Sequence, residues 1–247
     1  MPAFKQSVER WRPLVRSARW YAGPVTENVT LANMFVESSG DPGRVGYTDV
    51  PKGYTDSEMS CGLPGFMRRR ALGLMQCAPT VVRSYNNAPV KPPNIWVTPC
   101  EMAGKTIADA QKQIEVGLYA EQMAWLTSLG RQPFKQDLTD NAILMFRLCY
   151  HAGPYQYKAQ LARTIAAGFP GTFAGMEQYR PKWGAPDRPF MGARRMLSEY
   201  KKAIGLPATD VPPYEPGPAP GPSGGGGALL LLLALAAAAF AFKRRTG

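Results

Sequence analysis

The chain has 247 residues, 45% of them hydrophobic, and a formal net charge of +11. This length fits one sizeable domain with appendages or two small domains. Almost all of the excess positive charge lies in residues 1–204, since only five charged residues follow. Such a charge favours anionic partners, for example nucleic acid, anionic lipid or the acidic polymers of a bacterial cell wall. No compact cluster of basic and aromatic residues occurs, so nucleic acid is not expected as a partner.

The cysteines do not indicate a zinc site. Cys61, Cys77, Cys100 and Cys149 are widely spaced, no C-x-x-C pair occurs, and the chain has one histidine. An even number of cysteines permits two disulfides in an oxidising compartment. Four free, partly buried thiols fit the sequence equally well, so both states stay open.

The first 23 residues predict a helix and not a targeting signal. They are charged throughout and lack the apolar stretch of a secretory signal peptide. Their apolar residues recur at helical spacing, which predicts an amphipathic helix interrupted or kinked near Pro13.

The stretch LANMFVESSGDP, residues 31–42, predicts the end of a buried helix. Its apolar run ends in a single acid, Glu37, and Gly40 and Pro42 are helix stop signals. Glu37 would then lie at the helix end with its stem among apolar neighbours. Desolvation there raises the pKa of a carboxyl group, as a general acid near neutral pH requires. The alternative is a solvated glutamate at a helix end.

Residues 43–70 are rich in Gly, Pro, Ser, Asp and Tyr and predict a long loop, with a short hairpin as the alternative. Asp49 and Asp56 lie in this segment and are candidates for a second carboxylate. The alternative for each is an ordinary solvated loop acid.

Four further helices are predicted at residues 106–129, 140–150, 155–167 and 189–204, with a Pro- and Asn-rich connection at 86–105. No alternating strand pattern competes with them. The predicted fold class is therefore mainly α, with any strand confined to residues 43–70.

The C-terminal part changes character. Residues 206–227 are a Pro- and Gly-rich linker, residues 228–242 are uninterruptedly apolar, and residues 243–247 form a basic tail. As a helix, 228–242 would be about 22 Å long, short of a hydrocarbon core of roughly 30 Å, although flanking glycines or a thinner bilayer would close the gap. We expect a transmembrane anchor helix, because the alternative, a buried core helix, has no core to join behind such a linker. Basic residues after it predict a domain outside the cytoplasm, which conflicts with the lack of a signal peptide.

Three motifs occur in order: ESSGDP at 37–42, GLMQ at 73–76 followed by Pro79 and Thr80, and YHAG at 150–153. Together they resemble the soluble lytic transglycosylase (SLT) domain, a relative of goose-type lysozyme, over about residues 10–203. The resemblance implies a lysozyme-like helical catalytic domain at 1–205, with residues 43–72 as an insert. It also implies an enzyme that works without metal or organic cofactor.

The resemblance assigns roles to individual residues. It implies that Glu37 is the single catalytic acid/base and that Ser38 orients the substrate or the acid. Met75 and Gln76 match glycan-contacting positions, and Tyr150 matches a tyrosine near the catalytic glutamate. The implied reaction cleaves the β-1,4 bond between N-acetylmuramic acid and N-acetylglucosamine in peptidoglycan, and the muramoyl 6-hydroxyl closes a 1,6-anhydro ring.

The chain departs from the family pattern at two places. The insert makes the distance between the first two motifs unusually long, and Arg70-Ala71-Leu72 stands before GLMQ where the family has Ser or Gly, then Ala and a variable residue. His151 replaces an asparagine. As the chain's one histidine it would either titrate near the site or make the same backbone hydrogen bonds as the asparagine.

Three functions therefore compete. The leading one is a lytic transglycosylase of the cell envelope, bacterial or phage-derived and membrane-anchored. The second is a lysozyme-like muramidase that activates water with Asp49 or Asp56. The third is a non-catalytic cell-wall-binding or envelope-assembly module.

Overall fold

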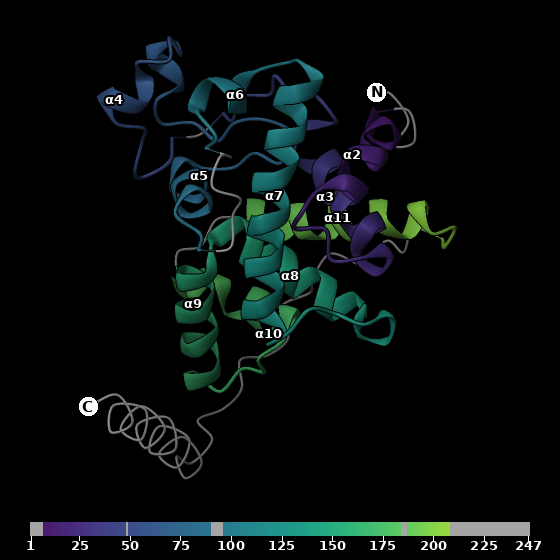
Figure 1. Cartoon of the computed structure of the whole chain (residues 1–247). Coiled ribbons are helices and arrows are strands. Elements are labelled where there is room, and N and C mark those ends of the chain that lie inside the picture. Colours follow the sequence, from purple (N-terminus) through teal and green to yellow (C-terminus); the bar gives the residue numbers. More distant parts are fainter. Residues whose placement is uncertain (1–6, 48, 90–95, 184–186, 208–247) are drawn as a thin grey trace, which may run out of the picture. The chain divides into compact units, whose positions relative to one another are not determined.

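The computed structural model describes residues 7–47, 49–89, 96–183 and 187–207 (Figure 1). The predicted anchor at 228–242, the basic tail at 243–247 and all but the first two residues of the linker lie outside them. Within the described residues, no helix is long and apolar enough to cross a membrane. The anchor therefore stays a prediction.

The mainly α fold class is confirmed. The described residues form helices and no named strand, and their β-pairing is limited to two isolated bridges, Val45 with Leu72 and Leu72 with Cys77. The α-helices are α2 (Arg12–Ser17), α3 (Pro24–Ser38), α4 (Asp56–Met59), α5 (Pro79–Asn86), α6 (Pro99–Ala103), α7 (Ile107–Ser128), α8 (Asp140–Ala152), α9 (Pro154–Ala166), α10 (Phe173–Tyr179) and α11 (Arg188–Ala203). The 3-10 helices are η1 (Glu9–Trp11), η2 (Gly65–Met67), η3 (Lys135–Asp137) and η4 (Arg180–Trp183).

The chain divides into two compact units. Unit 1 comprises Met1–Lys158 and Pro186–Pro212, and unit 2 comprises Ala159–Ala185 and Pro213–Gly247. In unit 2, the rings of Phe169 and Tyr179 pack with their centroids 5.3 Å apart. Every predicted site residue belongs to unit 1.

The long helices begin where the sequence supplies caps. The Thr106 side chain accepts a hydrogen bond from the Asp109 backbone N–H at the start of α7, and the Asp109 side chain closes a capping box. Thr139 caps α8 in the same way, accepting from the Ala142 N–H. Apolar periodicity, together with these caps at α7 and α8, explains why the four predicted helices lie within about two residues of α7, α8, α9 and α11. The N-terminal helix begins differently from the prediction, because Pro13 stands in the first turn of α2, where it has no hydrogen bond to break.

The core of unit 1 is built from α3, α7, α8 and α11. α11 packs against α3 and α8, and α7 packs against α8 (Figure 1). Helix α3 is buried along almost its whole length, including Leu31 and Met34. Because it is enclosed on nearly every side, the polar residues that α3 carries must find partners inside the protein.

The insert at 43–72 is irregular, and the hairpin alternative does not form in its described residues. Its two ends are joined by the Val45–Leu72 bridge and by a hydrogen bond from the Gly46 N–H to the Ala71 carbonyl, 2.8 Å. Its outer part, α4, is held by an ion pair between Arg83 and Glu58, 2.7 Å.

One disulfide joins the insert to α6. Cys61 and Cys100 are bonded across 39 residues, while Cys77 and Cys149 are free and buried. This answers the question that the sequence left open: the chain uses one bridge, and its other two thiols belong to the core.

We expect reduction of this disulfide to destabilise unit 1. Closing a loop of this length lowers the entropy of the unfolded chain, which corresponds to about 4 kcal/mol as an upper value. Urea unfolding with and without reductant measures the difference. The double variant C61S/C100S is the control, because reductant should not change its midpoint. Equal midpoints for the oxidised and reduced natural chain would contradict a stabilising role.

Candidate active site

Glu37 lies in the last turn of α3, as predicted. The helix ends at Ser38, and Ser39 adopts a left-handed conformation with φ 56°, followed by Gly40 with φ 79°. The Gly40 carbonyl accepts a hydrogen bond from the Trp11 indole N–H, 3.0 Å. A Cβ atom at position 40 would lie 2.1 Å from the Ser7 carbonyl oxygen, so only glycine fits this turn. The turn fixes the direction in which the end of α3 points.

Ser38 stabilises this helix end. Its hydroxyl donates to the Met34 carbonyl, 3.1 Å, and accepts from the Gly40 N–H, 3.1 Å. The side chain is buried. The hydroxyl thus donates one hydrogen bond and accepts another within the protein. Its contribution to the site is to hold the turn that follows Glu37.

Glu37 forms a buried ion pair with Arg147 of α8. The Glu37 Oε1 and Arg147 Nη2 atoms are 2.7 Å apart, and the side chains are 15% and 4% exposed. Burial raises the pKa of Glu37, and the nearby Arg147 charge opposes this shift without cancelling it. Glu37 therefore keeps its proton to a higher pH than a solvated glutamate, which is the property of a general acid.

Tyr150 lies beside this pair and connects it to the GLMQ segment. Its ring centroid is 5.6 Å from the Arg147 guanidinium carbon, and its hydroxyl donates to the Met75 carbonyl, 2.6 Å. The Cys77 thiol lies 4.0 Å from the same hydroxyl. Burial raises the pKa of Tyr150, so the hydroxyl stays protonated and keeps donating.

The Met75 side chain lies in the core. It is fully buried and occupies the space beside Gly117 of α7, where a Cβ atom would come within 2.2 Å of the Met75 Cγ. A glycan in a cleft does not reach such a side chain. Met75 instead contributes packing and the carbonyl that binds Tyr150.

Gln76 is half-buried and ties the insert to the GLMQ segment. It adopts a left-handed conformation with φ 47°. Its side-chain amide donates to the carbonyls of Arg44 and Gly73, 3.0 Å each. Gln113 of α7 fixes Leu74 of the same segment: its side-chain amide oxygen accepts a hydrogen bond from the Leu74 N–H, 2.9 Å. The sequence analysis did not single out Gln113, a polar residue on a buried helix face.

His151 is neutral at pH 7. Neighbouring protein desolvates the imidazole, and the Arg147 charge disfavours a second positive charge, so the pKa of His151 is lowered to about 4 although the residue is exposed at the surface. The imidazole of His151 therefore gains its proton only at acidic pH.

Asp49 and Asp56 pair with arginines of their own insert. The side chains are 54% and 92% exposed; Asp49 lies 3.4 Å from Arg70, and Asp56 pairs with Arg68. Neither aspartate pairs with Arg147, the partner of Glu37. Within the described ranges, no group of three His, Cys, Asp or Glu side chains could hold a metal ion.

A second buried carboxyl group, Glu121 of α7, lies in the same core. It is 3% exposed and accepts hydrogen bonds from the Thr30 hydroxyl, 2.6 Å, and the Asn33 amide, 2.9 Å. Burial raises its pKa to about 7, against the opposing effects of these bonds and of Arg147. The sequence held a signal for it, because Glu121 falls on the apolar face of the helix predicted at 106–129, in line with Leu118 and Trp125.

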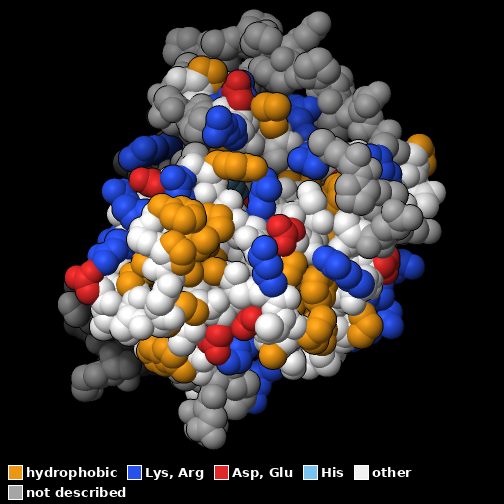
Figure 2. Space-filling view, turned by 90° about the horizontal axis from the view of Figure 1, so that it is seen from above, with side chains coloured by type: hydrophobic (Ala, Val, Ile, Leu, Met, Phe, Trp, Pro, Cys, Tyr) orange, Lys and Arg blue, Asp and Glu red, His pale blue; other side chains and the backbone are white. Residues whose placement is uncertain are grey.

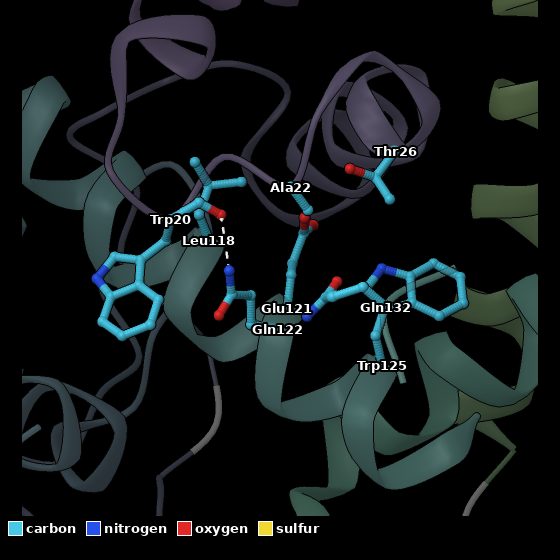
Figure 3. A pocket seen from close by; sticks show the side chains of 8 residues that line it. All are labelled: Trp20, Ala22, Thr26, Leu118, Glu121, Gln122, Trp125 and Gln132. Carbon is cyan, nitrogen blue, oxygen red and sulfur yellow. Dashed lines mark hydrogen bonds between the residues drawn. The ribbon is translucent and has the colours of Figure 1, made fainter. Parts of the chain in front are cut away.

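A small cavity adjoins Glu121. Figure 3 shows the Glu121 side chain reaching from α7 toward the segment of Ala22 and Thr26. The cavity volume is about 10 Å³, room for roughly one water molecule. It is too small for a sugar ring and is not a substrate site.

Comparison of the chain with protein-family models, curated proteins and solved structures gives no match. The likeness to the SLT domain therefore depends on the three sequence motifs alone and stays a prediction.

We expect Tyr150→Phe to lower the free energy of unfolding by about 1–2 kcal/mol, because it removes the hydrogen bond to the Met75 carbonyl. Tyr157→Phe is the matched control, since the buried Tyr157 hydroxyl has no hydrogen-bond partner among the residues that the structure describes, and its removal should be neutral or stabilising. Chemical denaturation measures both. Equal losses for the two variants would show that the Tyr150 hydroxyl makes no specific contribution.

Glu121 should make stability depend on pH. Its pKa is about 7 in the folded chain and about 4.3 when unfolded, so the folded state binds more protons. Its contribution is fully present below about pH 4.3 and is lost as pH rises through 7. Between pH 4.5 and 7.5, the natural chain should lose more stability than Glu121→Gln. Parallel curves of unfolding free energy against pH would show that Glu121 does not hold its proton.

Proposed function

We propose that this chain is a peptidoglycan lytic transglycosylase with Glu37 as its catalytic acid and base. The observation that carries the proposal is the largely buried Glu37 carboxyl group at the end of α3, with a raised pKa and an ion pair to Arg147. An unfavourably buried acid is costly for the fold, and such groups concentrate at functional sites. This favours an enzyme over a non-catalytic wall-binding module.

In the proposed reaction, Glu37 donates its proton to the glycosidic oxygen as the bond to C1 of N-acetylmuramic acid breaks. The N-acetylglucosamine side leaves as an alcohol, and the acetamido oxygen of the muramoyl residue bonds to C1. The muramoyl 6-hydroxyl oxygen then displaces the acetamido oxygen, and its proton returns to Glu37. No water is consumed, and the product is a 1,6-anhydro sugar.

Arg147 suits both halves of this cycle. Its charge stabilises the Glu37 carboxylate that exists between the two proton transfers, while burial raises the pKa of the resting group and so favours its protonated form. A preorganised charge in a buried site acts strongly because little water screens it. The hydroxyl of Tyr150 holds the GLMQ segment next to this pair.

The surface charge fits an acidic polymer as the substrate. Figure 2 shows Lys and Arg side chains spread over the visible face and outnumbering Asp and Glu. A dispersed positive field favours association with an extended anionic polymer such as the cell wall. Attachment to a membrane through residues 228–242, and hence a location in the cell envelope, belongs to the same proposal.

The test uses purified sacculi and mass spectrometry of the products. The natural chain should release 1,6-anhydro-muropeptides, and Glu37→Gln should reduce the rate about 1,000-fold, since it removes the general acid. Full activity in Glu37→Gln would overturn the proposal.

Asp49→Asn and Asp56→Asn are the matched controls, because these aspartates are exposed acids paired within the insert. Each should retain the activity of the natural chain. Products with reducing ends, together with loss of activity in one of these variants, would establish the muramidase alternative instead.

A further inference from the structure

Glu121 has no part in the proposed reaction, yet it is anchored to the helix that carries Glu37. Its two hydrogen-bond donors, Thr30 and Asn33, both belong to α3. Asn33 precedes Glu37 by four residues, so the two side chains leave the same face of the helix one turn apart. Glu121 therefore fixes the turn of α3 directly before the proposed catalytic acid.

Arg147 connects the two carboxyl groups. It is 96% buried, given its 4% exposure, and its charge acts on both Glu37 and Glu121. Only its Nη2 atom bonds to Glu37, and its Nε and Nη1 atoms have no hydrogen-bond partner among the described residues. Two ionised acids around one guanidinium would leave an excess negative charge in a desolvated core. The ionisation of either acid therefore raises the pKa of the other.

The other titratable groups around this centre are uncharged. Tyr150 and Cys77 have raised pKa values because both are buried, and His151 is neutral. The charges of the centre are those of Arg147, Glu37 and Glu121; on α11, which packs against α3 and α8, the Arg195 guanidinium carbon lies 5.7 Å from the Phe35 ring centroid.

We propose that Glu121 is a positioning residue for Glu37: it holds the preceding turn of α3 through Thr30 and Asn33, and its carboxyl group is coupled to that of Glu37 through the charge of Arg147. The catalytic consequence rests on the function proposed above. The coupling between the carboxyl groups of Glu37 and Glu121 is independent of that function and can be measured without any substrate.

The variant Glu121→Gln tests the proposal with little change in shape. The glutamine oxygen can still accept from the Thr30 hydroxyl. The unpartnered Oδ1 of Asn33 can accept from the new amide once the Asn33 side chain turns over. Glu115→Gln is the matched control, because Glu115 is a buried acid of the same helix, 7% exposed, whose partner is the Arg19 N–H, 2.9 Å, and not Arg147.

The first readout is the dependence of kcat/KM on pH. In Glu121→Gln, residue 121 carries no charge, so Arg147 acts on Glu37 alone and favours its carboxylate. The alkaline limb of the kcat/KM profile should therefore move to lower pH by roughly 0.5–1 unit. Glu115→Gln should leave the limb in place. If Glu121→Gln gives the natural profile while Glu37→Gln is inactive, this inference is wrong and the proposed function stands.

The second readout is the carboxyl-carbon NMR titration of the full chain labelled at glutamate, with the Glu37 signal assigned by its absence in Glu37→Gln. The Glu37 signal should titrate at lower pH in Glu121→Gln and be unchanged in Glu115→Gln. An unshifted Glu37 titration in Glu121→Gln would overturn the coupling, whatever the activity measurements show. A shifted titration with full activity in Glu37→Gln would confirm the coupling and refute the catalytic role.

Discussion

The ion pair between Glu37 and Arg147 is the interaction on which the candidate site depends. Removing two charges from water is unfavourable, and the attraction between them compensates only when the geometry is good. Here the geometry is set by α3 and α8, which α11 packs together. Glu37 is consequently desolvated, and the positive charge of Arg147 still stabilises its ionised form. That combination allows one carboxyl group to give and then recover a proton.

The surrounding structure keeps this pair in place through a chain of specific contacts. Arg147 lies against the Tyr150 ring, Tyr150 binds the Met75 carbonyl, and Met75 packs into the space that Gly117 leaves on α7. The Gln113 side-chain oxygen accepts a hydrogen bond from the backbone N–H of Leu74, the residue before Met75. The motif residues Ser38, Gln76 and Tyr150 thus work as scaffold, because their side chains hydrogen-bond to backbone carbonyls. Glu37 remains the group with the chemistry of an acid catalyst.

Local patterns in the sequence were sufficient for the long helices and for the place of Glu37 on α3. Apolar periodicity and capping threonines act over a few residues, so they can be read without knowing the partners of a helix. The short helices α5 and α6 escaped prediction because each spans only about two turns and carries little periodic signal. The Cys61–Cys100 pairing could not be read from spacing, because it depends on where the insert folds back.

The sequence by itself determined that the chain is mainly helical and that an acid follows the apolar run ending at Val36. Only the tertiary structure decided which charges share the core with that acid. Arg147 and Glu121 lie far from Glu37 along the chain, and ordinary surface residues of the same types would look identical in the sequence. Their burial, and hence the strength of their effect on Glu37, arises because α11 packs against α3 and α8 and α7 packs against α8, which lets side chains of α7 and α8 reach those of α3. Electrostatic effects depend on distance and desolvation, and both are properties of the folded chain.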